Sequence, residues 1–153
     1  MANSYSQIYI QAVWAVKYRQ ALLQKPWRDD FFAIVANLIN RAGCKSFIVN
    51  GVEDHIHCLF SLPAKLSVSK VMQEVKSISS KHLNETDLLN HRFEWQRGFG
   101  AFSYSKSDIS NVYRYIENQE NHHKKQEFIP EYKEILKKFE IDYDEEYIFK
   151  EPL

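Results

Sequence analysis

Two histidines on one predicted strand are the first candidates for chemistry in this chain. His55 and His57 lie in a run from Val52 to Leu62 that is rich in β-branched and aromatic residues and has no helical period. Because alternate side chains of a strand leave opposite faces, the two imidazoles should emerge side by side. Neutral imidazole nitrogens bind divalent cations, so the pair could begin a metal site. Two ligands do not complete such a site, and a third must come from elsewhere.

The histidine pair by itself leaves two interpretations open. An H-x-H sequence on a strand can also be two half-exposed side chains that bind nothing. Zinc hydrolases usually continue this motif into further histidine and aspartate residues, whereas this chain continues with Cys58, Leu59 and Phe60. The zinc-hydrolase interpretation is therefore weakened, and the third ligand decides whether an ion site exists.

Length and composition suit one compact domain over residues 1–153. The chain is 44% hydrophobic, which is enough for a core. Cys44 and Cys58 have apolar neighbours and are expected to be reduced thiols, and the N-terminus lacks the pattern of a signal peptide. The apolar runs are shorter than the ~20 residues that span a bilayer. We expect a cytoplasmic protein without a membrane partner.

The formal net charge of zero hides an asymmetry along the chain. Residues 140–153 form an acidic C-terminal tail with six acidic side chains against one lysine, a net charge of −5, so residues 1–139 carry +5. A mildly basic body is compatible with a polyanionic ligand. An excess of this size is also common on a solvated face.

The apolar periodicities predict an alternation of strands and helices. The histidine strand should follow an acidic turn at Glu53 and Asp54, and Ser67 is placed to cap a helix. The predicted elements are a strand over 5–16, a helix that begins near Asp29 and Asp30 and ends at Gly43, a strand over 45–52, the histidine strand over 52–62, a helix over 67–78, a loop over 84–90 and a strand at the end of 93–104.

The order strand, helix, strand, strand, helix, strand is that of a ferredoxin-like, or RRM-like, α+β fold. Such a domain has one antiparallel sheet with its helices on one face. Ile56, Cys58 and Phe60 form an apolar set that should meet those helices. The histidines are then expected on the other face, open to a substrate or to another subunit.

A further helix could supply what the histidine pair lacks. It should begin at Ser107 or Asp108 and run towards His122 and His123. Its buried stripe at 100° per residue consists of Ile109, Val112, Tyr113, Ile116 and Glu120. Tyr115 and Gln119 lie one turn apart at the border of this stripe and face the same space. They offer a hydroxyl nucleophile and a hard oxygen ligand. An amphipathic helix with an edge tyrosine is the alternative.

At this point the chain resembles a known family. Asp54-His55-Ile56-His57 matches the His-hydrophobe-His (HUH) motif, Trp95-Gln96-x-Gly98-Phe99 matches the usual lead into the last helix, and Tyr115 to Gln119 matches Tyr-x-x-x-Gln. Over residues 5–139 the chain resembles the single-tyrosine HUH transposases of small insertion sequences, which include the repeat-associated tyrosine transposases. Three linked motifs are a far more specific signal than H-x-H alone.

The resemblance implies an enzyme that transposes DNA. It implies metal-dependent cleavage and rejoining of single-stranded DNA at hairpin-containing element ends, through a 5′-phosphotyrosine intermediate. Tyr115 is then the nucleophile, and His55, His57 and Gln119 hold one Mg²⁺ or Mn²⁺ ion. The resemblance also implies a homodimer, in which the tyrosine helix of one protomer can serve the histidines of the other.

Basic side chains near the tyrosine helix could contact DNA phosphates, with Phe102 and Tyr104 available for stacking. These side chains are Lys106, Arg114, His122, His123, Lys124 and Lys125. Exposed basic residues on a helix are also ordinarily just solvated. Residues 130–139 predict another amphipathic helix, which should pack on the body of the domain or on a partner.

Two other functions remain open at this stage. A non-catalytic module that binds single-stranded nucleic acid could use the same fold without Tyr115. A metal-dependent nuclease that uses water as its nucleophile would need the histidines but not the tyrosine.

Overall fold

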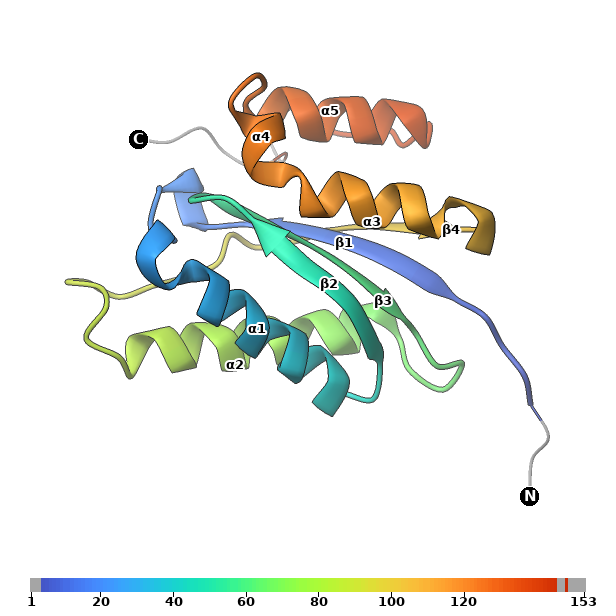
Figure 1. Ribbon diagram of the computed structural model, residues 1–153, viewed down its shortest axis with the longest axis horizontal. Coiled ribbons are helices and arrows are strands. Elements are labelled where there is room, and N and C mark those ends of the chain that lie inside the picture. Colours follow the sequence, from blue (N-terminus) through green and yellow to red (C-terminus); the bar gives the residue numbers. More distant parts are fainter. Residues whose placement is uncertain (1–3, 146–147, 149–153) are drawn as a thin grey trace.

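The computed structural model describes residues 4–145 and 148, in which four strands form one antiparallel sheet in the order β2-β3-β1-β4. Helices α1 and α2 cover one face of this sheet, and α3, α4 and α5 lie on the opposite face (Figure 1). The elements are β1 (Tyr9–Ala15), α1 (Lys25–Arg41), β2 (Lys45–Gly51), β3 (His55–Ser61), α2 (Val68–Asn84), β4 (Gly100–Tyr104), α3 (Ile109–Glu117), α4 (Gln119–His123) and α5 (Phe128–Lys138), with 3₁₀ turns η1 (Lys17–Arg19) and η2 (Lys106–Asp108).

The predicted fold class is confirmed, because the element order and the sheet order are those of a ferredoxin-like domain. Several element ends differ from the sequence prediction. Helix α1 begins at Lys25, since Pro26 in the first turn has the φ that a helix needs and loses only an amide that has no partner there. Helix α2 continues past Ile78 to Asn84, and Ser67 caps it as predicted by accepting from the Lys70 amide.

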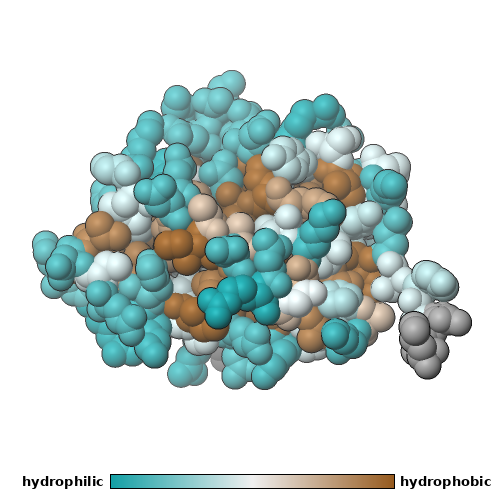
Figure 2. All heavy atoms as spheres, turned by 60° about the horizontal axis from the view of Figure 1, so that its bottom comes forward, coloured by the Kyte–Doolittle hydropathy of each residue, from teal (hydrophilic) through white to brown (hydrophobic). Residues whose placement is uncertain are grey.

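The larger core lies between the sheet and helices α1 and α2. Alternate residues of the central strands point into it, and Trp14 and Phe60 are among its largest fully buried side chains. Ile56 and Cys58 share this face, as the alternation predicted. Figure 2 shows the molecule from this side, where hydrophilic side chains interrupt the apolar patches.

The expectation that the histidine face is open is wrong. Helix α5 packs on it through Phe128, Ile129, Tyr132 and Leu136, which meet Val13, Ala15 and Phe102 of the sheet. Helix α3 packs beside it, where Val112 and Ile116 contact Leu59. The prediction failed because the alternation of one strand cannot show what folds back over its far face. Residues 130–139 do form a helix, and it packs on the body of its own chain.

The predicted tyrosine helix is not continuous. It breaks at Asn118, whose backbone has φ −92° and ψ 17°, and the short helix α4 follows in a new direction. Asn50 of β2 donates hydrogen bonds of 3.0 and 3.1 Å to the carbonyl oxygens of Ile116 and Glu117. Carbonyl oxygens at the end of a helix have no hydrogen-bond donor within the helix, so they need a partner such as Asn50.

The predicted buried stripe is wrong at two of its positions. Val112 and Ile116 are buried, whereas Tyr113 is 38% exposed and Glu120 is exposed. A calculation at 100° per residue assumes one straight helix, so it fails for Glu120, which follows the break. Tyr113 precedes the break and lies at the edge of the predicted stripe. Glu120 instead forms an ion pair of 2.7 Å with Lys25 at the start of α1.

Two further expectations concern the ends of the chain and the membrane. The acidic tail falls partly outside the described residues, since 146–147 and 149–153 are not described. Within the described part, Glu145 pairs with Lys133 at 2.9 Å. Among the described helices, none has the length and apolar character to cross a bilayer. The prediction of one domain over 1–153 remains a prediction.

Candidate metal centre and nucleophile

The histidine pair lies near the middle of the sheet. Strand β3 is flanked by β1 and β2, and His55 and His57 are opposite Ala15 and Val13 of β1. Their ring centroids are 5.3 Å apart, and both side chains are fully buried. The alternation of the strand therefore brings the two imidazoles together, as the sequence indicated.

The Nδ1 atom of each ring has a partner away from the centre of the site. Nδ1 of His55 is 2.7 Å from Oδ1 of Asp54, which fixes a proton on Nδ1 and leaves a lone pair on Nε2. Nδ1 of His57 is 3.1 Å from the side-chain amide of Gln11, whose oxygen accepts from the Tyr104 hydroxyl at 2.7 Å. Such partners orient a metal-binding imidazole and set its tautomer.

Tyr115 and Gln119 both reach the histidine pair within the same chain. The ring centroid of Tyr115 is 5.7 Å from that of His57, and Oε1 of the fully buried Gln119 is 3.3 Å from Nε2 of His55. The two residues face the same space even though Asn118 separates them by a helix break. The structure therefore places all four residues of the two motifs around one centre.

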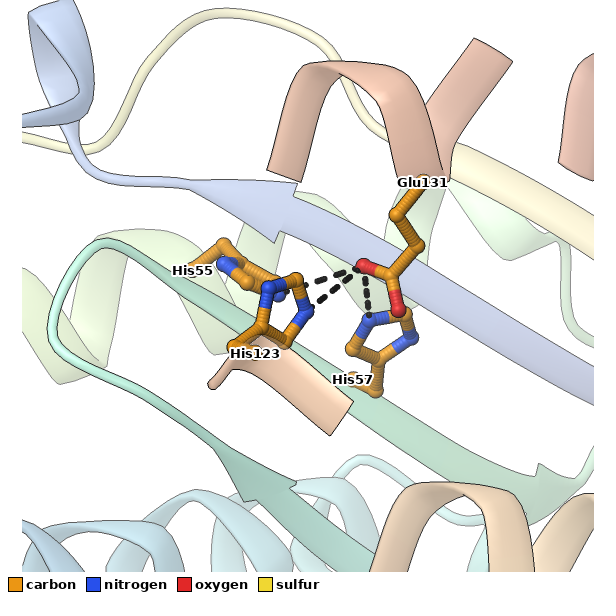
Figure 3. Close-up of side chains that lie close together, drawn as sticks. All are labelled: His55, His57, His123 and Glu131. Carbon is orange, nitrogen blue, oxygen red and sulfur yellow. Dashed lines mark hydrogen bonds and ion pairs between the residues drawn. The ribbon is translucent and has the colours of Figure 1, made fainter. Parts of the chain in front are cut away.

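Two residues at this centre were missed as ligands by the sequence reasoning. Oε1 of Glu131, on α5, is 3.3 Å from Nε2 of His57, 3.4 Å from Nε2 of His55 and 3.0 Å from Nε2 of His123, on α4 (Figure 3). The one sequence signal for Glu131 is its place on the apolar side of α5, one turn from both Phe128 and Ile135.

Glu131 also joins the histidines to the tyrosine. Its second oxygen, Oε2, accepts a hydrogen bond from the hydroxyl of Tyr115 and one of 3.2 Å from the side-chain amide of Gln119. Nε2 of His122 lies 3.2 Å from the same oxygen. The carboxylate thus contacts the histidines through one oxygen and the candidate nucleophile through the other.

Burial and hydrogen bonding act against each other on the acidic and basic groups here. Burial alone would raise the pKa of Glu131, but the close approach of the His123, His55 and His57 rings holds it well below its ordinary value, so the group is a carboxylate. Burial lowers the pKa of His57. Burial also acts to lower the pKa of His55, but hydrogen bonds to Asp54 and Glu131 raise it overall.

The surroundings of Tyr115, the candidate nucleophile, favour its protonated form. Burial, followed by the negative charge of Glu131, raises the pKa of Tyr115 well above its ordinary value. The phenol is therefore neutral in this structure. It would have to lose its proton during an attack rather than before it.

The donor set suits a divalent metal ion. One ligand atom from each of His55, His57, His123 and Glu131 lies within 4.8 Å of all the others. Metal–nitrogen bonds of about 2.1 Å place two ligands of one ion at most ~4.2 Å apart, so shifts of a few tenths of an ångström would gather the four atoms around an ion. The carboxylate on Nδ1 of His55 is also the kind of second partner that a metal-binding histidine has.

A groove leads from the surface to the tyrosine. It has a volume of about 600 Å³ and lies between β4, α3 and α5. Tyr104 and Lys138 line it, and Tyr115, His122 and Glu131 are at its inner end. A flexible chain could reach the tyrosine hydroxyl by this route.

Most of the residues predicted to contact DNA lie on the surface, away from the centre of the site. Lys106, Arg114, Lys124 and Lys125 are exposed, and His122 is half-buried at the centre of the site. Arg114 donates a hydrogen bond of 2.6 Å to Asn111 on its own helix. Phe102 lies beneath α5, so the expectation that it could stack on a base is wrong.

Fold and site together define a class of protein. It is an α+β domain that presents a tyrosine hydroxyl beside a cluster suited to a divalent metal. The model of the family described as "Transposase IS200 like" matches residues 4–119. Because this match covers most of the chain, the chain belongs to the IS200-like transposase family, a family of DNA-transposing enzymes. The resemblance stated from the motifs is confirmed.

Two solved structures show the same fold at low sequence identity. A candidate transposase from Deinococcus radiodurans R1 is 18% identical, with a TM-score of 0.62 over 78% of this chain and 95% of that one. A REP-associated tyrosine transposase bound to a REP hairpin is 15% identical, with a TM-score of 0.60 over 80% of this chain and 73% of that one. The comparison with curated proteins gives no match.

Proposed function

We propose that this transposase cleaves and rejoins single-stranded DNA through a covalent bond to Tyr115. The observation that carries the proposal is the meeting of Tyr115 and Gln119 with His55 and His57 inside one chain. These are the residues that the tyrosine and histidine motifs supply. A nucleophile and a candidate metal site in contact are what strand cleavage by this route requires.

The proposed ion is Mg²⁺ or Mn²⁺, held by His55, His57 and Gln119. When bound, it would draw charge from the non-bridging oxygens of a phosphodiester and orient the phosphorus for in-line attack. Glu131 orients the Tyr115 hydroxyl through Oε2. The phenol loses its proton as it attacks, and its hydrogen bond directs this proton towards Oε2 of Glu131.

The proposed reaction conserves the energy of the broken bond. As the oxygen of Tyr115 bonds to phosphorus, the bond from phosphorus to the 3′-oxygen breaks, giving a 5′-phosphotyrosine and a free 3′-hydroxyl. Phenolate is a better leaving group than an alkoxide, so a second 3′-hydroxyl can attack the ester and rejoin DNA without ATP. Hydrolysis by water would end the reaction instead.

DNA is proposed to enter by the groove between β4, α3 and α5. Tyr104 is half-buried at its wall and offers a ring for stacking. Contacts with phosphates are proposed for Lys106, Arg114, His122, Lys124 and Lys125. A hairpin-containing element end is the proposed substrate, and the hairpin bound by the REP-associated relative supports this. We also propose that the protein acts in the cytoplasm, because the proposed substrate is cellular DNA.

A homodimer is also proposed, on the resemblance to the family. In this structure the histidines receive Tyr115 and Gln119 from their own chain. The geometry therefore supports an active site within one protomer, and dimer formation would have to serve another step.

The experiment is an assay for a covalent adduct. The protein is incubated with Mn²⁺ and single-stranded oligonucleotides from hairpin-containing element ends, and a denaturing gel reports protein that stays attached to DNA. The wild type should form an adduct, and Tyr115→Phe and His55→Ala should not. Tyr113→Phe is the matched control, because it removes an exposed hydroxyl from the same helix.

Other outcomes identify the alternatives. Cleavage without an adduct, retained by Tyr115→Phe and lost by His55→Ala, would show a nuclease that uses water. Binding that survives both substitutions, with no cleavage by the wild type, would show a non-catalytic binding module. Either result would overturn the proposed function.

A further inference from the structure

We infer that His123 and Glu131 join His55 and His57 as ligands, so that the centre presents three imidazoles and one carboxylate beside the Gln119 oxygen, and that it selects Mn²⁺ over Mg²⁺. The inference deepens the proposed function, on which it rests for the reaction that the ion serves. It adds two ligands, from α4 and α5, that the motifs do not contain. Metal binding itself can be measured without DNA.

The four side chains converge on one point. Nε2 of His55, His57 and His123 all lie 3.0–3.4 Å from one oxygen, Oε1 of Glu131. Figure 3 shows the three rings turned towards this oxygen from β3 and α4, with the carboxylate entering from α5. A neutral imidazole can donate one proton only, and Nδ1 of His55 holds its proton for Asp54. At least one of these close pairs therefore has no proton to share, and a cation between the atoms would satisfy all of them.

The carboxylate and the strand histidines are buried. Glu131 is 2% exposed, and His55 and His57 are fully buried. A buried carboxylate is costly unless it is paired or coordinates a metal. The partners nearest to Glu131 are imidazoles, a hydroxyl and an amide, and none of these carries a permanent positive charge. A divalent cation would supply the charge that this arrangement lacks.

Neighbouring side chains hold the rings of His55 and His57 in place. Asp54 holds His55 from behind, and the ring of Phe128 stacks on it at 4.1 Å and 22°. His57 can ligate if Nδ1 carries the proton, which requires the amide of Gln11 to be turned so that its oxygen accepts. Its amide nitrogen would then donate to the Tyr104 oxygen. Both orientations of this amide keep its contacts with His57 and Tyr104.

The donor types determine the preference between metals. Mg²⁺ favours oxygen ligands and keeps several of its waters, whereas imidazole nitrogens bind first-row transition ions. Three imidazoles leave little room for a hydrated Mg²⁺. Gln119 donates to Oε2 of Glu131, so it also orients the carboxylate whose other oxygen would bind the ion.

Mn²⁺ binding to the full chain, stripped of metal with a chelator, tests the ligand set. Calorimetry and the paramagnetic resonance signal of free Mn²⁺ both report affinity. The wild type should bind one ion, with at least a tenfold preference over Mg²⁺ in competition. Glu131→Gln and His123→Asn should each weaken the affinity by about tenfold or more.

Matched controls separate ligand loss from general damage. Glu134→Gln removes an exposed carboxylate from the same helix, and His91→Asn removes an exposed histidine from a loop. Both should bind Mn²⁺ as the wild type does. Circular dichroism and melting in chelator show whether each variant folds. If Glu131→Gln fails to fold, His123→Asn still tests the set, and the nitrogen couplings of bound Mn²⁺ should fall in that variant.

Wild-type affinity in both Glu131→Gln and His123→Asn would overturn the inference, as would a wild type that binds Mg²⁺ as well as Mn²⁺. Metal binding is measured without DNA, so it does not depend on strand cleavage by Tyr115. Failure of the adduct assay with these metal results intact would therefore reject the proposed function alone. A normal adduct with unchanged affinity in both variants would reject the ligand set alone.

Discussion

Asp54 and His55 are adjacent in the chain, and Nδ1 of His55 donates a hydrogen bond of 2.7 Å to Oδ1 of Asp54. The carboxylate fixes the tautomer that leaves Nε2 free for a metal and raises the basicity of the ring. Asp54→Asn should therefore weaken Mn²⁺ affinity by about tenfold or more, with the fold retained. A calorimetric titration of the chelator-treated protein measures the change.

The neighbouring Glu53 provides the control for Asp54, because its side chain is exposed and pairs only at 3.9 Å, with Arg28. Glu53→Gln should bind Mn²⁺ like the wild type. If Asp54→Asn binds as tightly as Glu53→Gln, the hydrogen bond to His55 has no part in holding the ion.

Asn50 is predicted to stabilise the helix break beside the nucleophile. Its amide donates to the last carbonyls of α3, at Ile116 and Glu117, just before the turn at Asn118. Asn50→Ala should lower the free energy of unfolding by about 1 kcal/mol, the usual contribution of a hydrogen bond. It should also slow adduct formation, because Tyr115 and Gln119 lie on opposite sides of this break. Urea unfolding and the adduct assay measure the two effects.

An exposed asparagine tests whether the effect belongs to this position. Asn90 lies in the loop after α2, and Asn90→Ala should change neither property. Equal behaviour of the two variants would contradict a role for Asn50 at the break.

Substitutions of Tyr113 and Ile116, both on α3, should differ sharply in their effect on stability. Ile116 is fully buried against Leu59, whereas Tyr113 is 38% exposed. Ile116→Ala should lower the free energy of unfolding by about 2–5 kcal/mol, because it leaves a cavity under the helix. Tyr113→Ala should change it by about 0.5 kcal/mol or less. Urea unfolding of both variants measures this, and a larger loss for Tyr113→Ala would mean that α3 is rotated.

Lys76 should make stability depend on pH in the alkaline range. Its ammonium donates to the carbonyl oxygens of Gln96 and Gly98 at 2.8 and 2.7 Å, and burial lowers its pKa to about 8 from 10.5. Between these values the unfolded chain binds more protons than the folded one, so stability due to this group rises with pH. The difference in unfolding free energy between the wild type and Lys76→Met should therefore increase from pH 8 to about 10.

Urea unfolding of both proteins at matched pH values measures this difference. Other groups that titrate in the same range, such as tyrosines, are common to both proteins and cancel. A difference that stays constant or falls with rising pH would show that burial does not hold the pKa of Lys76 down.

The sequence determined the elements and much of the site because these depend on local periodicity. Alternation along one strand put His55 and His57 on the same face, and the helical repeat put Tyr115 and Gln119 one turn apart. The order of strands and helices restricted the fold to the ferredoxin-like class. Each of these is a property of neighbouring residues, and each is readable without knowing the rest of the chain.

Only the tertiary structure decided that the histidine face is covered, that the tyrosine helix breaks at Asn118, and that His123 and Glu131 meet His55 and His57. Glu131 and His57 are far apart in the chain, and their contact depends on the direction in which α5 returns across the sheet. That direction follows from the packing of Phe128 and its neighbours on β1 and β4. Packing between distant segments leaves no periodic pattern in the sequence, so a carboxylate on the apolar side of a helix became interpretable only once its surroundings were known.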